Sequence, residues 1–361
     1  MTIEKLARRE ILELQPYETA KQVAGLVRLN ANEAPWPIDG GSRDGLNRYP
    51  QIRPLDLHAR LAAHYGVSPD MILATRGSSE AIDLLIRAFC RAGVDNIMVS
   101  PPTFAMYRVY ADIQGAQTIS APLQADNDFA LDAAAVLEGC TAETKLVFVC
   151  SPNNPTGGLV PLPAVQELCL GRADRSLIIV DEAYAEFSDA PSATSLFDDD
   201  SRRYANLVVL RTLSKGYSLA GARCGAVIAI PAAIRLLSRI LAPYALATPV
   251  VDCVLRALEP EGIERARRAA GKVLRERERL AVALRQCPDV VNVWPSRSNF
   301  LLVKFRSLPE AEERLRAHRI LVREFADDAA LRNCARISVG TPQENDLLLE
   351  ALGACAERRL T

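Results

Sequence analysis

Apolar runs and amphipathic segments alternate along the middle of the chain. Segments with a helical period separate short runs rich in valine, isoleucine and leucine, which occur at 96–100, 144–150, 176–181 and 206–211. Such runs predict buried strands, with helices between them that cover both faces of one sheet. Because the alternation continues for about 180 residues, the sequence predicts an α/β fold with a mostly parallel sheet.

The two ends of the chain have a different pattern. Residues 1–16 are amphipathic and predict a short helix, and an arm rich in asparagine and proline follows. After residue 249 come a long charged helix, antiparallel strands and a further helix, which indicate a smaller α+β domain. We therefore expect three parts: a helix and arm at 1–40 that pack with the small domain and the substrate site, a large domain at 41–248 and a small domain at 249–361.

Composition and charge narrow the class of protein. Hydrophobic residues make up 49% and charged residues 24% of the 361, which is typical of a globular protein. The net charge of −1 provides no global field for nucleic acid or anionic membranes, and we expect neither as a partner. No apolar stretch reaches the roughly 18 residues of a membrane span, and residues 1–14 lack the apolar region of a secretory signal.

Cysteines and histidines indicate a cytoplasmic protein without a metal site. The nine cysteines are scattered singly, with no C-x-x-C pair, which suits reduced thiols better than a disulfide framework. The three histidines are too dispersed to ligate a metal, and we expect His58 and His64 on a helix surface.

Residues 208–225, VVLRTLSKGYSLAGARCG, contain the strongest candidate chemistry. Lys215 lies between a β-branched run and a turn rich in glycine and alanine, with Thr212, Ser214 and Arg223 nearby. Two hydroxyls and a guanidinium in one loop suit a phosphate, and a lysine beside them could bind an aldehyde cofactor. The alternative is a strand that ends in a solvated Ser-Lys turn.

A second candidate for anion binding is the turn that contains Gly77, Ser78 and Ser79. It precedes a helix that we expect to run to Gly93, and free N–H groups at a helix start can bind an anion. Ordinary capping of the helix by one of the two serines is an equal alternative.

Polar residues follow the predicted strands and could converge at one edge of the sheet. Asn154, Asp181 and Lys215 each come just after a strand, where sites of open α/β sheets form. A carboxylate at the end of an apolar strand needs a cation, and a protonated pyridine nitrogen is one. Asn154 and Tyr184 could donate to a ring oxygen and Tyr107 could lie flat on the ring, although core packing is the alternative for either tyrosine.

The motifs SPNNPTGG, VDEAY and LRTLSKGYSLAGARCG, in this order and spacing, resemble the fold-type I pyridoxal-phosphate aminotransferases over nearly the whole chain. This resemblance implies a seven-stranded sheet in the large domain and a homodimer. The motifs LQPYETA, LNANEAPWP, RYP, RGSSEAIDLLIRAFC, PPTFAMY, ILVREF and ARISVGT are similar to those of histidinol-phosphate aminotransferases within that group. Ala34 and Ser79 depart from residues frequent in the family, at positions that the chemistry does not demand.

The resemblance implies a role for each candidate residue. Lys215 would bind pyridoxal 5′-phosphate through its amine and then move a proton, while Asp181 would pair with the pyridine nitrogen. Asn154 and Tyr184 would hold the ring oxygen, and Tyr107 would stack on the ring. The remaining residues would bind phosphate or substrate: Gly77, Ser78, Ser79, Thr212, Ser214 and Arg223 the cofactor phosphate, Tyr49 the same phosphate from the partner subunit, and Tyr17, Asn32, Arg323 and Arg336 the substrate.

Three reactions remain open at this point. The first is transamination between histidinol phosphate and 2-oxoglutarate, a step of histidine biosynthesis in which paired arginines bind the anionic end. The second is transamination of aromatic amino acids, and the third is decarboxylation of threonine phosphate, against which Ser214 counts mildly. For Arg323 and Arg336 the alternative is a surface ion pair with a neighbour such as Glu324. A cofactor-sensing regulator would want a DNA-binding extension, and residues 1–16 are too short for one.

Overall fold

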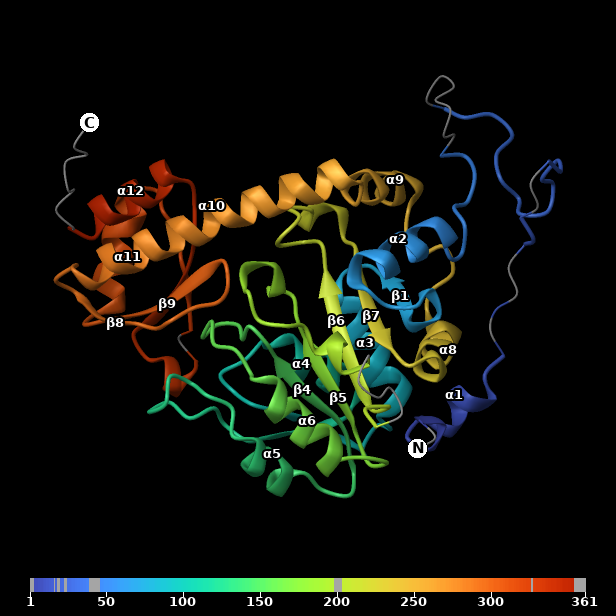
Figure 1. The fold of residues 1–361 in the computed structure, drawn as a ribbon, viewed down its shortest axis with the longest axis horizontal. Coiled ribbons are helices and arrows are strands. Elements are labelled where there is room, and N and C mark those ends of the chain that lie inside the picture. Colours follow the sequence, from blue (N-terminus) through green and yellow to red (C-terminus); the bar gives the residue numbers. More distant parts are fainter. Residues whose placement is uncertain are drawn as a thin grey trace.

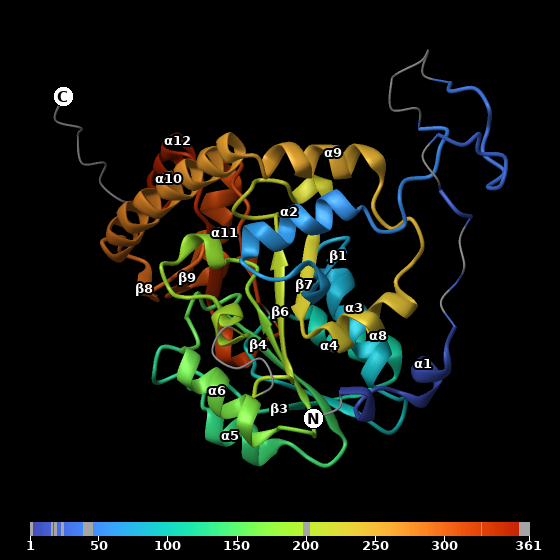
Figure 2. The same cartoon turned by 45° about the vertical axis from the view of Figure 1, so that its right-hand side comes forward.

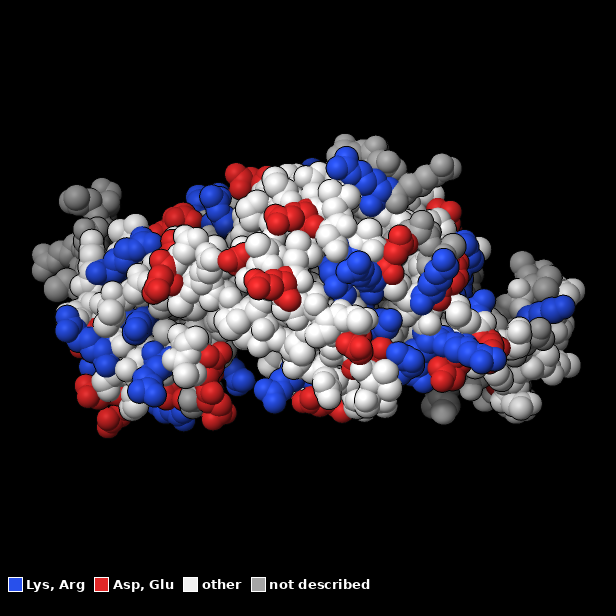
Figure 3. All heavy atoms as spheres, turned by 90° about the horizontal axis from the view of Figure 1, so that it is seen from below, with Lys and Arg blue, Asp and Glu red and all other residues white. Residues whose placement is uncertain are grey.

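The computed structural model describes residues 3–15, 17, 20–22, 25–38, 46–197, 203–325 and 327–353. Figure 1 shows a large domain built on one sheet and a small domain at one end of the molecule, with the long helix α10 running between them. No helix in the described ranges has the length and apolar character needed to cross a membrane. On the face shown in Figure 3, basic and acidic side chains are intermixed over both domains.

The large domain contains the predicted mostly parallel sheet of seven strands. The order is β1-β7-β6-β5-β4-β2-β3, and only β7 runs antiparallel to its neighbours. Parallel pairing follows from the helical crossovers between successive strands. The strands are β1 (Ile72–Thr75), β2 (Asn96–Val99), β3 (Gln117–Ser120), β4 (Thr144–Cys150), β5 (Leu177–Asp181), β6 (Leu207–Thr212) and β7 (Gly225–Ala229).

Helices cover both faces of this sheet, as the apolar runs predict. Successive residues of a strand point to opposite faces, so Leu210 packs in one core and Val209 in the other. Helices α3 (Ser78–Phe89), α4 (Met106–Gln114) and α8 (Pro231–Ile240) form the first layer. The second consists of α2 (Leu55–Tyr65), α5 (Ala133–Gly139), α6 (Leu162–Gly171) and α9 (Thr248–Ala257). The short 3₁₀ helices are η2 (Pro69–Met71), η3 (Ala185–Phe187), η4 (Ala193–Ser195) and η5 (Ala220–Ala222).

The small domain has the α+β character predicted for it. Its four strands pair antiparallel in the order β10-β11-β9-β8, and its helices pack on one another and on this sheet around a separate core. The predicted boundary at 249 falls inside α9, whose Val254 is buried in the large-domain core. The elements are α10 (Pro260–Arg285), β8 (Val290–Val293), β9 (Phe300–Phe305), α11 (Leu308–Ala317), β10 (Arg323–Glu324), η6 (Ala329–Leu331), β11 (Cys334–Ser338) and α12 (Pro342–Ala351).

The N-terminal helix differs from its prediction. Instead of one helix there are two short ones, η1 (Ile3–Lys5) and α1 (Arg9–Glu13), because the Arg8 backbone is extended and its N–H donates to the Ala88 carbonyl. Ile3 is buried in a core shared with α8, so these helices pack on the large domain and not on the small one. Residues 25–38 likewise lie at the side of the molecule away from the small domain (Figures 1 and 2).

Two further local predictions are corrected. The helix that follows Gly77 ends at Phe89 rather than at Gly93, because Cys90 already has an extended backbone. His58 is buried, not on the surface: α2 packs on β1, and the ring lies 2.9 Å from the Pro54 carbonyl and accepts the Ala74 N–H at 3.3 Å. His64 is half-buried beside the Tyr217 hydroxyl.

Candidate active site

The carboxyl ends of β4, β5 and β6 meet at a cavity of about 150 Å³. Asn154, Asp181 and Lys215 all line it, so the convergence expected from the strand ends is present. The last residues of β4 and β5, Cys150 and Asp181, are paired across the two parallel strands. The complete lining is Ser78, Ser79, Phe104, Cys150, Asn154, Asp181, Ala183, Tyr184, Thr212, Ser214, Lys215, Ala220 and Arg223.

One end of the cavity is the start of α3. Gly77 is the N-cap residue with φ +79°, so neither Ser78 nor Ser79 is the capping residue. The N–H groups of the first helical turn have no partner within the helix and can bind an anion. A Cβ atom on Gly77 would lie 2.9 Å from Nη2 of Arg223, and one on Gly225 would lie 2.8 Å from the Gly77 backbone. The two glycines therefore allow the guanidinium to approach the helix start.

Hydroxyl groups complete this end of the cavity. Thr212 Oγ1 lies 3.0 Å from Ser214 Oγ, and Arg223 Nη1 lies 3.4 Å from the same oxygen. The Arg223 backbone is left-handed, with φ +55°, and its Nη1 also donates to the Ala220 carbonyl at 3.0 Å. A guanidinium and two hydroxyls next to a helix N-terminus form the donor set that binds a phosphate.

Lys215 extends from the turn after β6 and reaches solvent through the cavity. Partial burial lowers the pKa of its amine, and the positive charges of Arg336 and Arg223 lower it further. Arg223 follows Lys215 in the same loop, whereas Arg336 belongs to β11 of the small domain, so its effect depends on a contact between the domains. A lysine with a lowered pKa can act as a base near neutral pH.

Among the residues that the structure describes, no cationic side chain pairs with the Asp181 carboxylate. The residue is 2% exposed. The Tyr107 hydroxyl donates to Oδ2 at 2.8 Å and the Ala183 N–H to Oδ1 at 3.2 Å. Burial nevertheless raises the pKa of Asp181 to about 6. An uncompensated buried carboxylate of this kind suits a ligand that carries a positive charge or a proton.

Tyr107 does not lie where the sequence prediction placed it. Its side chain is fully buried, its ring stacks on Phe148 at 4.6 Å, and its hydroxyl is held by Asp181. It therefore lies behind Asp181, because α4 turns this residue toward the sheet. Phe104, in the loop before α4, lines the cavity in its place and contacts Tyr107 edge-on. The motif PPTFAMY contains both aromatic residues. Phe104 precedes α4 and Tyr107 lies within it, so the residue at which the helix starts decides which of the two rings faces the cavity.

Asn154 and Tyr184 lie together on the side of the cavity that faces the small domain. Asn154 Nδ2 is 3.3 Å from the Tyr184 hydroxyl, and Arg336 Nη1 donates to Asn154 Oδ1. Arg336 thus links β11 of the small domain to the edge of the large sheet. Phe300 of β9 packs edge-on against Tyr184 and also beneath the Arg336 guanidinium.

Arg323 and Arg336 are directly opposite each other on the antiparallel strands β10 and β11. Side chains of such a pair share one face of the sheet. In the part of the chain that the structure describes, neither arginine forms an ion pair, so the alternative pairing with Glu324 does not occur there. Burial lowers the pKa of Arg336, and the charge of Arg323 adds to this. Two neighbouring guanidinium groups, of which Arg336 acts on Lys215, can bind an anionic substrate group.

Three predicted residues lie outside this cavity in the single chain. Tyr49 is half-exposed and stacks on Tyr244 with ring centroids 4.6 Å apart. Tyr17 is 75% exposed, and Asn32 is exposed with φ +54°. The motif LQPYETA is described only in part, since Pro16, Glu18 and Thr19 lie outside the described residues. Roles for these residues in a dimer stay predictions.

The chain is similar to known proteins along almost its whole length. Residues 20–352 match the family model described as aminotransferase class I and II. Histidinol-phosphate aminotransferases of Stenotrophomonas maltophilia and Pectobacterium carotovorum are 41% and 40% identical over 353 residues, which is 97% of this chain and 96% and 97% of theirs.

Solved structures agree with this similarity. The histidinol-phosphate aminotransferase of Sinorhizobium meliloti, in complex with pyridoxal-5′-phosphate, is 25% identical with a TM-score of 0.75 and covers 84% of this chain and 82% of its own. A decarboxylase from Sulfurospirillum multivorans is 26% identical with a TM-score of 0.73, over 84% of this chain and 86% of its own.

Proposed function

Because this chain belongs to the class I and II aminotransferases, we propose that it transfers an amino group between L-histidinol phosphate and 2-oxoglutarate. The products are imidazole-acetol phosphate and glutamate, and the reverse direction serves histidine biosynthesis. Relatives of this name at 40–41% identity support the substrate assignment. The decisive structural observation is Arg336, whose charge acts on Lys215 and which has Arg323 opposite it on the neighbouring strand; such a pair suits substrates whose common feature is an anionic end.

The cavity residues fit pyridoxal 5′-phosphate. The start of α3, Thr212, Ser214 and Arg223 provide a phosphate site, and the uncompensated Asp181 provides a partner for a protonated ring nitrogen. Phe104 offers an aromatic face in the cavity on which the ring could stack, the role that the sequence predicts for Tyr107. When bound, this cofactor supplies an aldehyde that takes up the amino group and a ring that accepts electrons.

Lys215 and Asp181 have complementary tasks in this reaction. The Lys215 amine, with its lowered pKa, would hold the cofactor through the aldehyde and, once the amino group of the substrate has displaced it, would be free to take up the proton from the amino-bearing carbon of the substrate. The Asp181 carboxylate keeps the ring nitrogen protonated. Asn154 and Tyr184 orient the ring by hydrogen bonds to its oxygen, and the Asn154–Arg336 bond fixes this pair next to the substrate anion.

We further propose that the active protein is a cytoplasmic homodimer. The arm presents several apolar side chains to solvent, among them Val27, Leu29 and Trp36 at 81–89% exposure, and such a surface favours burial against a second chain. In that dimer Tyr49 reaches the partner's cofactor phosphate, and Tyr17 and Asn32 close over a substrate site. The eight cysteines of the described residues are all free thiols, as expected for a reducing compartment.

A single-turnover experiment tests the substrate. The purified protein is loaded with pyridoxal phosphate, and its visible absorbance is followed after mixing with histidinol phosphate, phenylalanine or threonine phosphate in parallel. We expect the fastest amino transfer from histidinol phosphate. Fast conversion by phenylalanine with none by histidinol phosphate would assign an aromatic aminotransferase instead. Release of carbon dioxide from threonine phosphate would assign the decarboxylase.

A further inference from the structure

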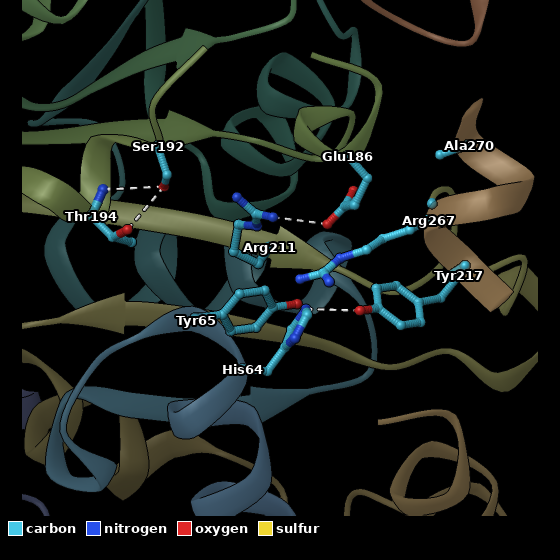
Figure 4. Close-up of a pocket in the computed structure, with 11 residues that line it drawn as sticks. His64, Tyr65, Glu186, Ser192, Thr194, Arg211, Tyr217, Arg267 and Ala270 are labelled. Atoms are coloured by element: carbon cyan, nitrogen blue, oxygen red, sulfur yellow. Dashed lines mark hydrogen bonds and ion pairs between the residues drawn. The ribbon is translucent and has the colours of Figure 1, made fainter. Parts of the chain in front are cut away.

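A second cavity, of about 360 Å³, lies on the other side of the Lys215 turn. It shares no lining residue with the cavity that holds Lys215. Figure 4 shows its side chains converging from the end of α2, from β6, from the turn after Lys215 and from α10. The lining consists of His64, Tyr65, Glu186, Ser192, Thr194, Arg211, Gly216, Tyr217, Ala266, Arg267 and Ala270.

Three buried polar atoms of this lining have no hydrogen-bond partner within the described protein. They are the Tyr65 hydroxyl, Nε of Arg211 and Oε2 of Glu186. Arg211 as a whole is 9% exposed. Buried polar atoms are almost always hydrogen-bonded, because an unpaired one loses its bonds to water without a replacement. Two donors and one acceptor around one cavity therefore indicate a polar occupant that can both accept and donate hydrogen bonds.

The charges around this cavity are unevenly distributed. Arg211 binds two carboxylates at once, Glu182 at 2.7 Å and Glu186 at 2.8 Å, so the three groups together carry one excess negative charge when ionised. Glu182 is further bound by Ser192 and the Ala193 N–H, whereas Oε2 of Glu186 remains unpaired. A cationic group of a ligand would restore the balance at Glu186.

Arg267 provides the opposite charge. Its side chain extends from α10 toward Tyr65 and Arg211 in Figure 4. Two neighbouring arginines on the same helix, Arg265 and Arg268, pair with Glu261 and Glu264, but Arg267 has no acidic partner among the described residues. A free guanidinium beside a tyrosine hydroxyl is a binding site for a carboxylate.

We propose that this second cavity binds an α-amino acid, with its ammonium group on Glu186 and its carboxylate on Arg267 and Tyr65. The rings of Tyr65, Tyr217 and His64 enclose the space that remains for the amino-acid side chain. This site is separate from the proposed catalytic function, since binding to it requires neither pyridoxal phosphate nor Lys215.

The position of the cavity makes the site regulatory. Gly216, the residue after Lys215, packs so closely on Glu186 that a Cβ atom on it would lie 2.5 Å from Cβ of the glutamate. Tyr217, the next residue, is held by His64 at 3.0 Å. A ligand that binds Glu186 therefore contacts the wall of the turn that positions Lys215, and its binding changes the rate of amino transfer.

The test must separate this site from the catalytic one, which also takes amino acids. The Arg336→Ala protein is loaded with pyridoxal phosphate and reduced with borohydride, so that the cofactor stays attached to Lys215 and its aldehyde no longer reacts with amino groups. It is then screened with the twenty α-amino acids by thermal shift, and hits are measured by isothermal titration calorimetry. We expect at least one amino acid to bind with one site per chain. Adding Arg267→Ala should weaken that binding by about tenfold or more, the loss of one charge-assisted contact, whereas the matched Arg265→Ala should leave it unchanged.

Further variants test the ligand's orientation. The decarboxylated amine and the N-acetylated form of the hit should each bind at least about tenfold more weakly, because each lacks one of the two charges. With Arg336 intact, the hit should alter turnover in the Arg265→Ala protein but not in the Arg267→Ala protein. Absence of any saturable binding, or binding that persists in Arg267→Ala, would overturn the proposal and leave a cavity that holds water only. Neither result would bear on the catalytic assignment.

Discussion

The hydrogen bond from Tyr107 to Asp181 sets the charge of the carboxylate on which the cofactor site depends. Tyr107→Phe removes one oxygen and keeps the ring that stacks on Phe148. Burial already raises the pKa of Asp181 to about 6 while this hydroxyl favours the ionised form. A hydrogen bond to a charged group contributes about 1.5–3 kcal/mol, and one pKa unit corresponds to about 1.4 kcal/mol. The variant should therefore have an Asp181 pKa about one to two units higher.

This shift predicts a loss of cofactor affinity that depends on pH. At pH 7 a carboxyl group of pKa about 6 is roughly one-tenth protonated, whereas one at 7 to 8 is about half to nine-tenths protonated. Only the ionised form pairs with a protonated ring nitrogen. The Kd for pyridoxal phosphate should therefore rise about two- to tenfold at pH 7 in Tyr107→Phe, and the difference should shrink toward pH 9.

The assay is equilibrium titration of the apoprotein with pyridoxal phosphate between pH 6 and 9. Tyr110→Phe is the matched control, because Tyr110 lies on the same helix and only partly in the same core, without a bond to Asp181. A Tyr107→Phe protein whose affinity falls equally at every pH would refute the reasoning, since it would assign Tyr107 a purely structural role. An unchanged Kd at pH 7 would do the same.

Three further outcomes follow from the same site. Asp181→Asn should make the apoprotein more stable at pH 7 but not at pH 4 in urea unfolding. Because the folded-state pKa of Asp181 is raised, the stability contributed by its protonated form is complete below about pH 4 and is lost as the pH rises through about 6. The total is on the order of 3 kcal/mol. Equal stabilisation by the variant at both pH values would contradict this. Lys215→Ala should abolish turnover but still bind the cofactor non-covalently, so that dialysis removes it. Near-normal turnover would exclude Lys215 as the catalytic base. Gly77→Ala should raise the Kd for the cofactor several-fold, because the new Cβ displaces Arg223 and the residue has φ +79°, so an unchanged affinity would argue against a phosphate at this helix start.

Sequence patterns predict the large sheet and its site well for a simple physical reason. Strands buried on both faces appear as continuous apolar runs, and the polar residues that follow each run lie at the carboxyl edge. Asn154, Asp181 and Lys215 could be placed together in this way before any coordinates. Gly77 lies in the turn that the sequence marks as a helix start, and Gly225 ends the motif that contains Lys215 and Arg223, so the phosphate end can also be predicted from local sequence.

Other features depend on contacts that no local pattern contains. Phe104 and Tyr107 are three residues apart, and the choice between them depends on which residue α4 turns toward Phe148. His58 is buried because α2 packs on β1, although its segment alone is consistent with a surface helix. The short N-terminal helices separate at Arg8 because its backbone N–H and its guanidinium both donate to carbonyls of α3. In each case a tertiary contact overrides a periodic pattern.

Lys215 is influenced by positive charges from both domains, Arg223 of the large domain and Arg336 of the small domain. Arg223 comes from the same loop and is fixed relative to Lys215, whereas Arg336 belongs to β11 and reaches the site through its bond to Asn154. Both charges lower the pKa of the lysine, after burial. Because Coulomb energies fall with distance, the position of the small domain sets the share of the pKa shift that comes from Arg336. The helix that begins that domain, α10, also contributes Arg267 to the second cavity. The proposed ligand of the second cavity would therefore contact both the turn that positions Lys215 and the helix that begins the small domain.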